Sequence, residues 1–200
     1  YDNLIRPFLD QPTTYKQTTG LKRKFVADFP ALVQHLRNGV SIWAWETNIQ
    51  EVPAPSGFDS NEWIFYEITR TVQPGDRYRF HGQLYVLTNS GCFSAAEDYV
   101  TAIKKTGLAS LVGRTTGGGA AGYIAPFIVR LPASGIIVVL EADLVLNPDG
   151  TFDELDGTKP DLELAPCELP EKVTREELLQ DVWIERIIAG VPTVARADHD

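Results

Sequence analysis

The chain has 200 residues, 44% of them hydrophobic and 22% charged, so it is long enough and apolar enough to bury a core. A net charge of −9 argues against nucleic acid as a partner, because phosphate binding requires clustered lysine and arginine, and Lys22-Arg23-Lys24 is too short a cluster. No apolar run reaches the roughly 18 residues of a membrane span, and no secretory signal is visible.

The first 80 residues are the least regular part of the sequence. Residues 1–20 are polar and threonine-rich, which predicts a loop, and the start at Tyr1 in a chain without methionine suggests a processed product or a fragment. The apolar spacing from Phe25 to Leu36 predicts a helix. Ser41–Glu46 and Trp63–Val72 are expected to be strands.

The middle of the chain has a clearer pattern. Leu84–Thr88 predicts a strand covered on both faces, and a helix is expected from Ser94 to about Lys105, ended by Gly107. Leu108–Gly113 is expected to be a second short buried strand, and Ile136–Leu140 a third apolar strand that Asp143–Leu146 could continue. Strand, helix and strand in this order predict an α/β sheet with crossover helices.

A capping box at Thr174–Glu177 precedes an amphipathic pattern and predicts a C-terminal helix that ends at Gly190. We divide the chain into a linker and N-terminal part of a core (1–80), a catalytic core segment (81–165), and a C-terminal helix and tail (166–200).

Ser94 is the candidate nucleophile. It follows a strand and a glycine-containing turn and begins a helix, and the small Ala95 and Ala96 leave room for a substrate backbone. The first N–H groups of a helix have no intrahelical partner, which makes the Ala95 N–H a candidate oxyanion donor. A serine that merely caps the helix is the alternative, and local sequence does not decide between the two.

Two stretches carry a family resemblance. Residues 80–122 (FHGQLYVLTNSGCFSAAEDYVTAIKKTGLASLVGRTTGGGAAG) and 147–164 (NPDGTFDELDGTKPDLEL) together resemble the tail-specific, or C-terminal processing, protease family. The resemblance places Ser94 on the nucleophile of the Ser-Ala-x-Glu motif. It implies a crotonase/ClpP-like α/β core with a parallel-rich sheet, the C-terminal portion of a larger protein. It also implies peptide-bond hydrolysis through an acyl-enzyme, without metal or organic cofactor.

The resemblance also distinguishes branches of the family. Gly119 stands where the better-known branch has the lysine of its Ser–Lys dyad, and Lys104 and Lys105 match nothing catalytic. The sequence is therefore similar to the tricorn-core branch, which uses serine, histidine and a carboxylate.

Glu154 falls on the family's carboxylate, where it would orient the histidine. Asp153 and Asp156 compete for this role, and a solvated acidic turn is the alternative.

The general-base histidine is not identified in the chain. The resemblance places it upstream of Tyr1, so that the fragment alone is expected to be inactive. His81 is expected at a strand end on the surface, His35 on a helix surface and His199 in the tail.

Three further features have simpler explanations than catalysis. Glu97, one helical turn after Ser94, is expected to cap the helix start or anchor the turn, and Cys92 is expected to be a packed small residue. Cys92 and Cys167 form neither a disulfide framework nor a metal-site pattern. Gly117, Gly118 and Gly119 lack the Lys-Ser/Thr of a phosphate loop, and are interpreted as a place where an extended peptide substrate approaches the backbone.

A non-catalytic binding module similar to the retinoid-binding repeats is the competing hypothesis, and a crotonase-type enzyme of lipid metabolism is a third.

The expected partners are a peptide or protein substrate and the upstream segment of the same protein. An extracytoplasmic location is implied by the resemblance alone, and the oligomeric state is left open.

Overall fold

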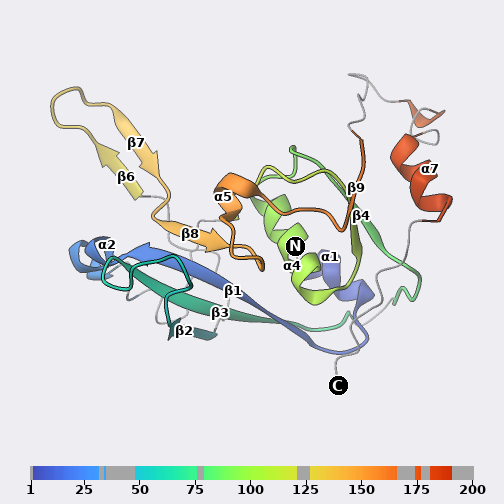
Figure 1. Ribbon diagram of the computed structural model, residues 1–200, viewed down its shortest axis with the longest axis horizontal. Helices are drawn as coiled ribbons and strands as arrows, with labels where there is room; N and C mark the ends of the chain where they lie inside the picture. The colour runs from blue at the N-terminus through green and yellow to red at the C-terminus, as the bar shows by residue number, and fades with distance from the viewer. Residues whose placement is uncertain are drawn as a thin grey trace.

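The computed structural model describes residues 2–31, 34, 48–75, 79–120, 127–165, 174–176 and 181–190. Within these residues the strands form an antiparallel sheet, a parallel sheet and a separate hairpin (Figure 1). The antiparallel sheet has the order β2-β3-β1-β8, made of β2 (Asn48–Val52), β3 (Trp63–Val72), β1 (Thr13–Lys22) and β8 (Asp143–Leu146). The parallel sheet has the order β4-β5-β9, made of β4 (Tyr85–Thr88), β5 (Ser110–Gly113) and β9 (Leu162–Glu163). The hairpin pairs β6 (Phe127–Arg130) with β7 (Ile137–Leu140).

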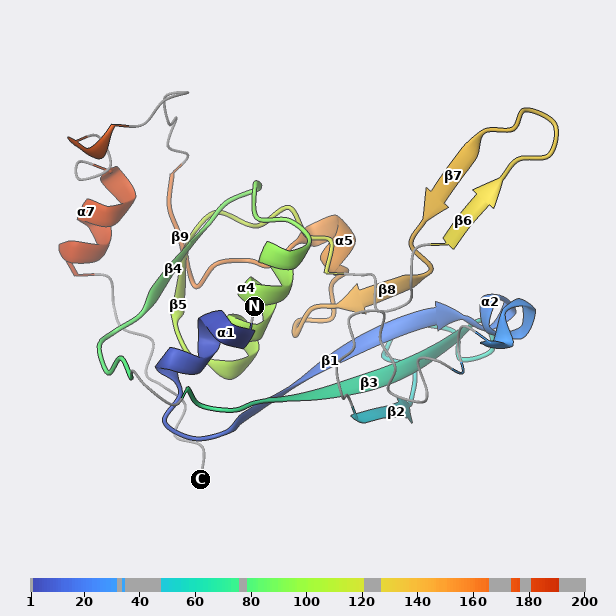
Figure 2. The same ribbon diagram turned by 180° about the vertical axis from the view of Figure 1, so that it is seen from behind.

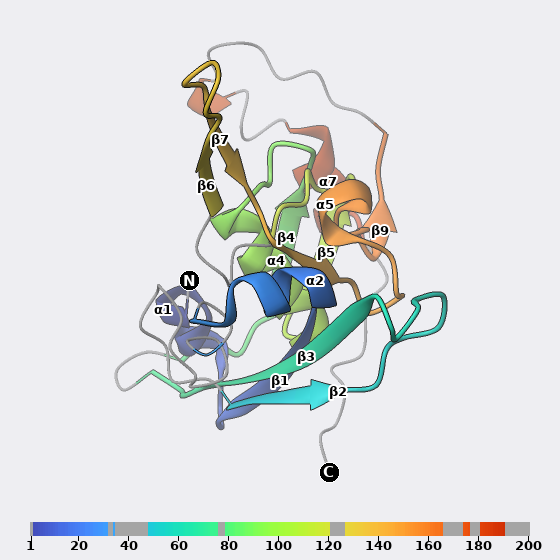
Figure 3. The ribbon, with the colours of Figure 1, turned by 90° about the vertical axis from the view of Figure 1, so that its left-hand side faces the viewer.

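The helices are α1 (Asp2–Ile5), the 3-10 turn η1 (Arg6–Phe8), α2 (Arg23–Asp28), α4 (Ala95–Thr106), α5 (Asp153–Asp156) and α7 (Val182–Ile188). The helix α4 joins the parallel strands β4 and β5 and packs between β1 and β5 (Figure 3). It ends at Gly107, whose φ of +60° is the left-handed conformation expected of a glycine stop. The predicted α/β class and its crossover helix are therefore confirmed.

The prediction of a loop over residues 1–20 is wrong, because ten residues from Thr13 form β1, which pairs with β3 on one side and β8 on the other. Tyr15 and Leu21 are buried on one face, while the β-branched threonines of the segment suit a pleated strand. The turn-like composition of residues 1–20 did not predict this strand, because the alternation of buried and exposed side chains depends on the strands that lie on either side of β1.

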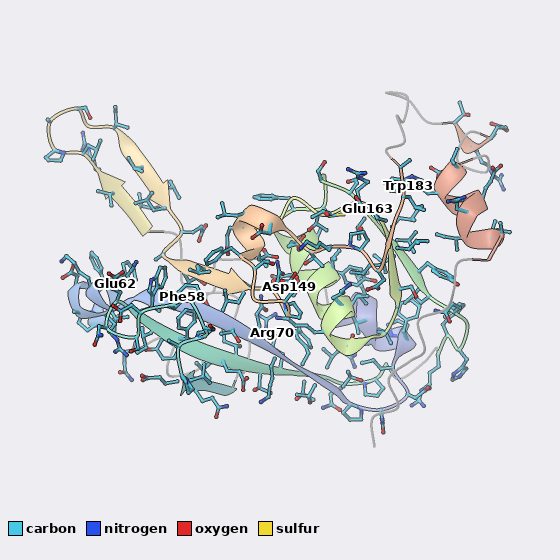
Figure 4. The ribbon with its side chains drawn as sticks, in the orientation of Figure 1. Phe58, Glu62, Arg70, Asp149, Glu163 and Trp183 are labelled. Carbon is cyan, nitrogen blue, oxygen red and sulfur yellow. The ribbon has the colours of Figure 1, made fainter. Side chains whose placement is uncertain are left out.

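Two apolar clusters are built along β1 and β3. One contains Tyr15 and Val72 together with α4 residues, and the other contains Leu21 and Ile68. The same face of the sheet also carries four buried polar residues: Gln17, Thr19, Arg70 and Asp143. Figure 4 labels Arg70 beside α4. The helix α4 packs on the apolar cluster around Tyr15, and the buried face becomes partly polar farther along β1.

The predicted third apolar strand is present as β7 (Ile137–Leu140). Ile136 is 58% and Ile137 65% exposed, and β7 pairs with β6 in a hairpin that projects away from both sheets (Figure 2). The strand β8 does not continue it but pairs with β1. β5 is buried throughout as expected, whereas Leu87 of β4 is 39% exposed, so β4 is not covered on both faces within the described residues.

Arg175 and Glu176 are helical directly after Thr174, as the capping box predicts, and residues 177–180 lie outside the described residues. A further helical segment, α7, ends at Ile188, two residues before Gly190. The Asp181 carboxylate accepts hydrogen bonds from the N–H groups of Trp183 and Ile184 (2.7 and 3.2 Å), which caps α7. The Trp183 indole donates to the Ala165 carbonyl at 3.0 Å, on the side of α7 that faces β9 (Figure 4).

Several predictions stay untested. The expected strand Ser41–Glu46 lies outside the described residues. The helix predicted from Phe25 to Leu36 is confirmed by α2 as far as Asp28 and by the helical residues 30, 31 and 34, with a break at Phe29, whereas residues 32, 33, 35 and 36 are not described. The three-part division of the chain also remains a prediction. In the described part of the chain, no helix has the length and hydrophobicity to cross a membrane.

A close packing contact in the antiparallel sheet gives a first test. A Cβ on Gly20 would lie 2.5 Å from Cε1 of Phe65, its cross-strand partner, whose ring is fully buried against Phe58 and Trp63. We expect Gly20→Ala to lower the free energy of unfolding by about 1–3 kcal/mol in urea denaturation, because the new Cβ forces the packed Phe65 ring or the strand to shift. Gly20→Ala combined with Phe65→Leu should cost less than the sum of the two single changes, and strict additivity would contradict this packing.

Candidate active site

A tight turn carries the chain from the end of β4 to Ser94. The Cys92 N–H donates to the Asn89 carbonyl at 2.9 Å, and the Asn89 side-chain oxygen accepts from the Gly91 N–H at 2.8 Å. Such an asparagine turn reverses the chain without further secondary structure. It delivers Ser94 to the carboxyl end of the parallel sheet, where α4 begins.

Ser94 has a strained backbone. Its φ of +58° with ψ of −119° is the single positive φ of a non-glycine residue in the described segments. A conformation of this kind costs about 1–3 kcal/mol and persists only where its surroundings hold it. Two hydrogen bonds do so: the Ser94 N–H donates to the Gly118 carbonyl at 3.2 Å, and the Ser94 carbonyl accepts from the Asp98 N–H at 3.0 Å.

The Ser94 side chain does not act as a helix cap. The residue is exposed and occupies the N-cap position, but its hydroxyl makes no hydrogen bond to the helix N–H groups. The strain therefore presents the hydroxyl outward at a strand-to-helix turn, the geometry of a nucleophile elbow.

The Ala95 N–H is available for an oxyanion. Ala95 and Ala96 are exposed, and the Ala96 N–H donates to the Phe93 carbonyl at 3.2 Å. Among the described residues, none accepts a hydrogen bond from the Ala95 N–H. This donor stands at the positive end of the twelve-residue helix α4, where it favours a negative charge.

The three glycines of the 117–119 stretch are packed against the chain itself. The Gly117 N–H donates to the Cys92 carbonyl at 2.8 Å, and a Cβ on Gly117 would lie 2.5 Å from the Ser90 carbonyl oxygen. A Cβ on Gly119 would lie 2.5 Å from the Phe93 ring, and one on Gly118 would overlap the Asp153 carbonyl oxygen. These close contacts support the Ser94 turn. That the three glycines contact an extended peptide substrate remains a prediction.

Behind the Ser94 turn lie two fully buried acids, Glu97 in the first turn of α4 and Asp153 at the start of α5. One Asp153 oxygen, Oδ2, accepts from the Ala120 N–H at 2.7 Å. Both Glu97 oxygens and Asp153 Oδ1 have no hydrogen-bond donor within the part of the chain described. Glu97 therefore does not cap the helix within the described residues, and its expected role as an anchor of the turn remains a prediction.

Burial raises the pKa of Glu97 to about 7, and the adjacent Asp153 contributes in the same direction. The hydroxyls of Thr116 and Thr158 lie near enough to oppose this rise in pKa. The pKa of Glu97 is nevertheless raised, because burial is the largest influence on it. The same hydroxyls have other contacts: Thr116 Oγ1 accepts from the Thr158 N–H at 2.7 Å, and the Thr158 hydroxyl lies 3.4 Å from that of Thr101.

Glu154 is half-buried in α5, and its Oε1 accepts from the Val145 N–H of β8 at 3.0 Å. Burial raises the pKa of Glu154 to about 7, and the nearby Asp153 and Asp143 add to the rise. Gly118 connects the two predicted catalytic residues, since its carbonyl binds Ser94 and its Cα faces Asp153 and the Cα of Glu154. The alternative explanation, a solvated acidic turn, does not apply to Glu154, because its side chain is half-buried and hydrogen-bonded to β8.

The competing candidates have other roles. The Asp156 Oδ2 accepts from the Phe152 N–H at 3.0 Å and so closes α5 on itself. His81 is exposed and lies 3.6 Å from Asp10, as expected of a surface group, and Lys104 binds Asp161 and the Lys159 carbonyl. His35 and His199 lie outside the described residues.

No group of three His, Cys, Asp or Glu side chains in the described segments is arranged to hold a metal ion. An open cavity of about 410 Å³ is lined by Arg23 of α2 and by residues of β2, β3 and the loop between them, including Val52 and Trp63, and shares no residue with the Ser94 turn.

Sequence reasoning did not find the burial of Glu97 and Asp153 behind the Ser94 turn. A glutamate three positions after a serine at a helix start is usually interpreted as an exposed capping residue. Nothing in a single sequence indicates that its side chain is completely buried.

The chain is similar to known proteins in both its sequence and its fold. The sequence profile of peptidase family S41 matches residues 10–164. A crystal structure of a candidate peptidase from Parabacteroides merdae is similar over 94% of this chain and 45% of that one, with 22% identity and a TM-score of 0.54. At this identity the likeness establishes the fold alone.

Two further structures have TM-scores below 0.5. Mature CPAF complexed with lactacystin is 19% identical, covering 82% of this chain and 36% of its own, with a TM-score of 0.49. The photosystem II D1 C-terminal processing protease is also 19% identical, covering 84% and 31%, with a TM-score of 0.43. The chain thus spans less than half the length of each structure, and comparison with curated protein sequences found no relative.

Gly118 offers a test of the support beneath Ser94. Gly118→Ala should lower the free energy of unfolding more than Gly150→Ala, by about 1–3 kcal/mol, because only the former forces a Cβ against Asp153. The control is matched, since Gly118 and Gly150 have φ of +74° and +82°, but nothing lies within 4 Å of a Cβ on Gly150. Equal losses in urea denaturation would mean that Gly118 is required for its φ alone.

Proposed function

The chain belongs to peptidase family S41, and from this membership we propose that it carries the nucleophile of a serine endopeptidase. The observation that carries the proposal is the positive φ of Ser94 at a strand-to-helix turn, with an exposed hydroxyl that caps nothing. Strain of this kind concentrates at functional sites, where the surrounding structure maintains it. The substrate class is a peptide or protein.

The reaction begins with attack of Ser94 Oγ on the carbonyl carbon of the scissile bond, while a general base takes the hydroxyl proton. The carbonyl oxygen gains negative charge and accepts a hydrogen bond from the Ala95 N–H. Collapse of this intermediate breaks the C–N bond, and the base returns its proton to the leaving amine. Water then hydrolyses the acyl-enzyme by the same steps and frees Ser94.

The general base in this proposal is a histidine that precedes Tyr1 in the full-length protein. His81, the one histidine in the described residues, is exposed and faces Asp10, and the proposal gives it no role. Without the upstream histidine the chain would have nucleophile, oxyanion donor and carboxylate but no base. An extracytoplasmic location remains a proposal from the family resemblance.

Glu154 is the proposed third member, which orients the histidine and stabilises its charged form. Glu154 is placed for this by the Val145 N–H, and Gly118 brings its backbone next to the Ser94 turn. Its pKa of about 7 has a consequence for activity, because only the ionised carboxylate stabilises an imidazolium. Activity should therefore fall as the pH is lowered through about 7, where Glu154 takes up a proton.

The nucleophile is tested by labelling the full-length protein with a serine-directed fluorophosphonate. We expect stoichiometric labelling of the parent, none of Ser94→Ala, and labelling like that of the parent for Cys92→Ala, which removes the nearby thiol. A parent that remains unlabelled would refute the peptidase and favour the non-catalytic binding module.

The carboxylate is tested by peptide hydrolysis with Glu154→Gln. Loss of the charge that orients the histidine should lower kcat by about 10²- to 10⁴-fold. The control Asp156→Asn removes a carboxylate from the same short helix and should change kcat by less than about threefold, since it reduces only a helix-terminal hydrogen bond. The reverse order of effects would transfer the role to Asp156.

A further inference from the structure

We propose that the cavity beside β2 and β3 is a binding site for an organic monocarboxylate, in which Arg23 holds the carboxylate and the apolar wall holds the rest of the molecule. The cavity shares no residue with the Ser94 turn, so the proposal does not depend on the catalytic role of Ser94. It gives a role to the basic cluster Lys22-Arg23-Lys24, which takes no part in the proposed peptidase reaction.

The cavity has the size and the lining of a small-molecule site. Its volume of about 410 Å³ lies within the range of ligand pockets, which is roughly 300–1,000 Å³. Most of its wall is apolar, formed by Val52, Pro53, Ala54 and Trp63 with the buried Ile64 and Phe65. A wall of this kind with a few polar groups suits a ligand that has an apolar body and one polar end.

The rim and the wall of the cavity are fixed by the protein's own contacts. The rim is the turn of residues 59–63, in which the Asp59 carbonyl accepts from the Glu62 and Trp63 N–H groups at 3.0 and 2.9 Å. The Trp63 ring lies edge-to-face against Phe58, with the ring centres 5.4 Å apart. Figure 4 labels Phe58 and Glu62 at the end of the sheet near α2. A site formed in advance loses less conformational freedom when a ligand binds.

Arg23 lies at the wall of this cavity with part of its guanidinium available. Its Nε–H donates to the carbonyl of Ser60 at 2.6 Å, and Ser60 lines the cavity as well. This hydrogen bond orients the guanidinium and engages one of its three nitrogens. Within the described residues, neither Nη group has a hydrogen-bond acceptor or an acidic partner. Two parallel N–H groups of an arginine match the two oxygens of a carboxylate.

The two lysines beside Arg23 are already paired with acids. Lys22 Nζ lies 2.8 Å from Glu62 Oε2 and 4.1 Å from the centre of the Trp63 ring. Lys24 Nζ lies 2.7 Å from Asp28 Oδ2. Arg23 is therefore the cation of this cluster that is available to a ligand.

The other charged residue of the lining limits the charge of the ligand. Glu51 also contributes to the wall, and an acidic residue repels a ligand with two or more negative charges, such as phosphate. A single carboxylate binds Arg23 with less repulsion, and the apolar wall favours a hydrocarbon body. An N-acylated apolar amino acid and an aliphatic acid share this chemistry.

The test is isothermal titration calorimetry of the full-length protein with N-acetyl-leucine, octanoate and three comparison compounds. We expect the two acids to bind the parent with a Kd on the order of 1 mM, as is usual for ligands of this size. N-acetyl-leucinamide lacks the charge and acetate lacks the apolar body, so each should bind at least about 10-fold more weakly. Inorganic phosphate should also bind at least about 10-fold more weakly, because of Glu51.

Three variants locate the binding. Arg23→Gln removes the guanidinium and should weaken the binding of both acids at least about 10-fold. The matched control Lys24→Gln removes a positive charge from the next residue and should change the Kd by less than about twofold, since this exposed lysine is paired with Asp28. Ala54→Trp places a large side chain in the cavity from the loop after β2, and it should weaken binding while Arg23 is intact. Unfolding midpoints of the three variants separate a lost site from a lost fold.

The outcomes distinguish the two sources of the ligand and expose a wrong proposal. Tighter binding of N-acetyl-leucine identifies a ligand derived from an amino acid, and tighter binding of octanoate identifies an aliphatic acid. Equal binding of both acids to the parent and to Arg23→Gln, tighter binding of phosphate, or no binding of either acid would overturn the site. None of these results bears on Ser94, and an unlabelled Ser94 would not alter them.

Discussion

Ser94 keeps a φ of +58° because the polypeptide is fixed on both sides of it, and most features of the fold around it serve that constraint. The asparagine turn fixes the approach from β4, and α4 fixes the departure. Between them, the Ser94 N–H is bound by the Gly118 carbonyl, which requires a glycine stretch that passes close to Ser90, Phe93 and Asp153. The strained backbone of Ser94 is thus held by three segments of the chain: the asparagine turn, α4 and the glycine stretch.

Buried polar groups accompany the apolar clusters around α4. One apolar cluster holds the middle and end of α4 through Val100 and Ile103, and the other lies at the far end of β1 and β3. Glu97 in the first turn of α4 and Asp153 at the start of α5 are both fully buried. Burying polar groups in this way costs stability and yields directional contacts, which can hold a strained turn.

The sequence carried enough information for the segments whose structure is decided locally. The helix α4 with its glycine stop, the buried strand β5 and the long strand β3 were predicted because apolar periodicity and stop residues act within a few positions. The strand β1 was missed because its environment is set by distant partners, since its threonines are part of a sheet only through pairing with β3 and β8. The strand β7 was predicted from the IIVVL run, but its pairing with β6 in an exposed hairpin was not. At the site, motif order selected Ser94 and Glu154, but neither the backbone strain of the first nor the burial of Glu97 and Asp153 is encoded in local pattern.

The central claim is that Ser94 is a nucleophile held in a strained turn with the Ala95 N–H aimed at the oxyanion. The most direct measurement is a crystal structure of the full-length protein after reaction with a peptidyl phosphonate. The account predicts a covalent bond from Ser94 Oγ to phosphorus, a phosphonyl oxygen about 2.7–3.1 Å from the Ala95 nitrogen, and a positive φ at Ser94. An adduct on another residue, or a Ser94 in ordinary helix-cap geometry with its hydroxyl bound to the helix N–H groups, would contradict it.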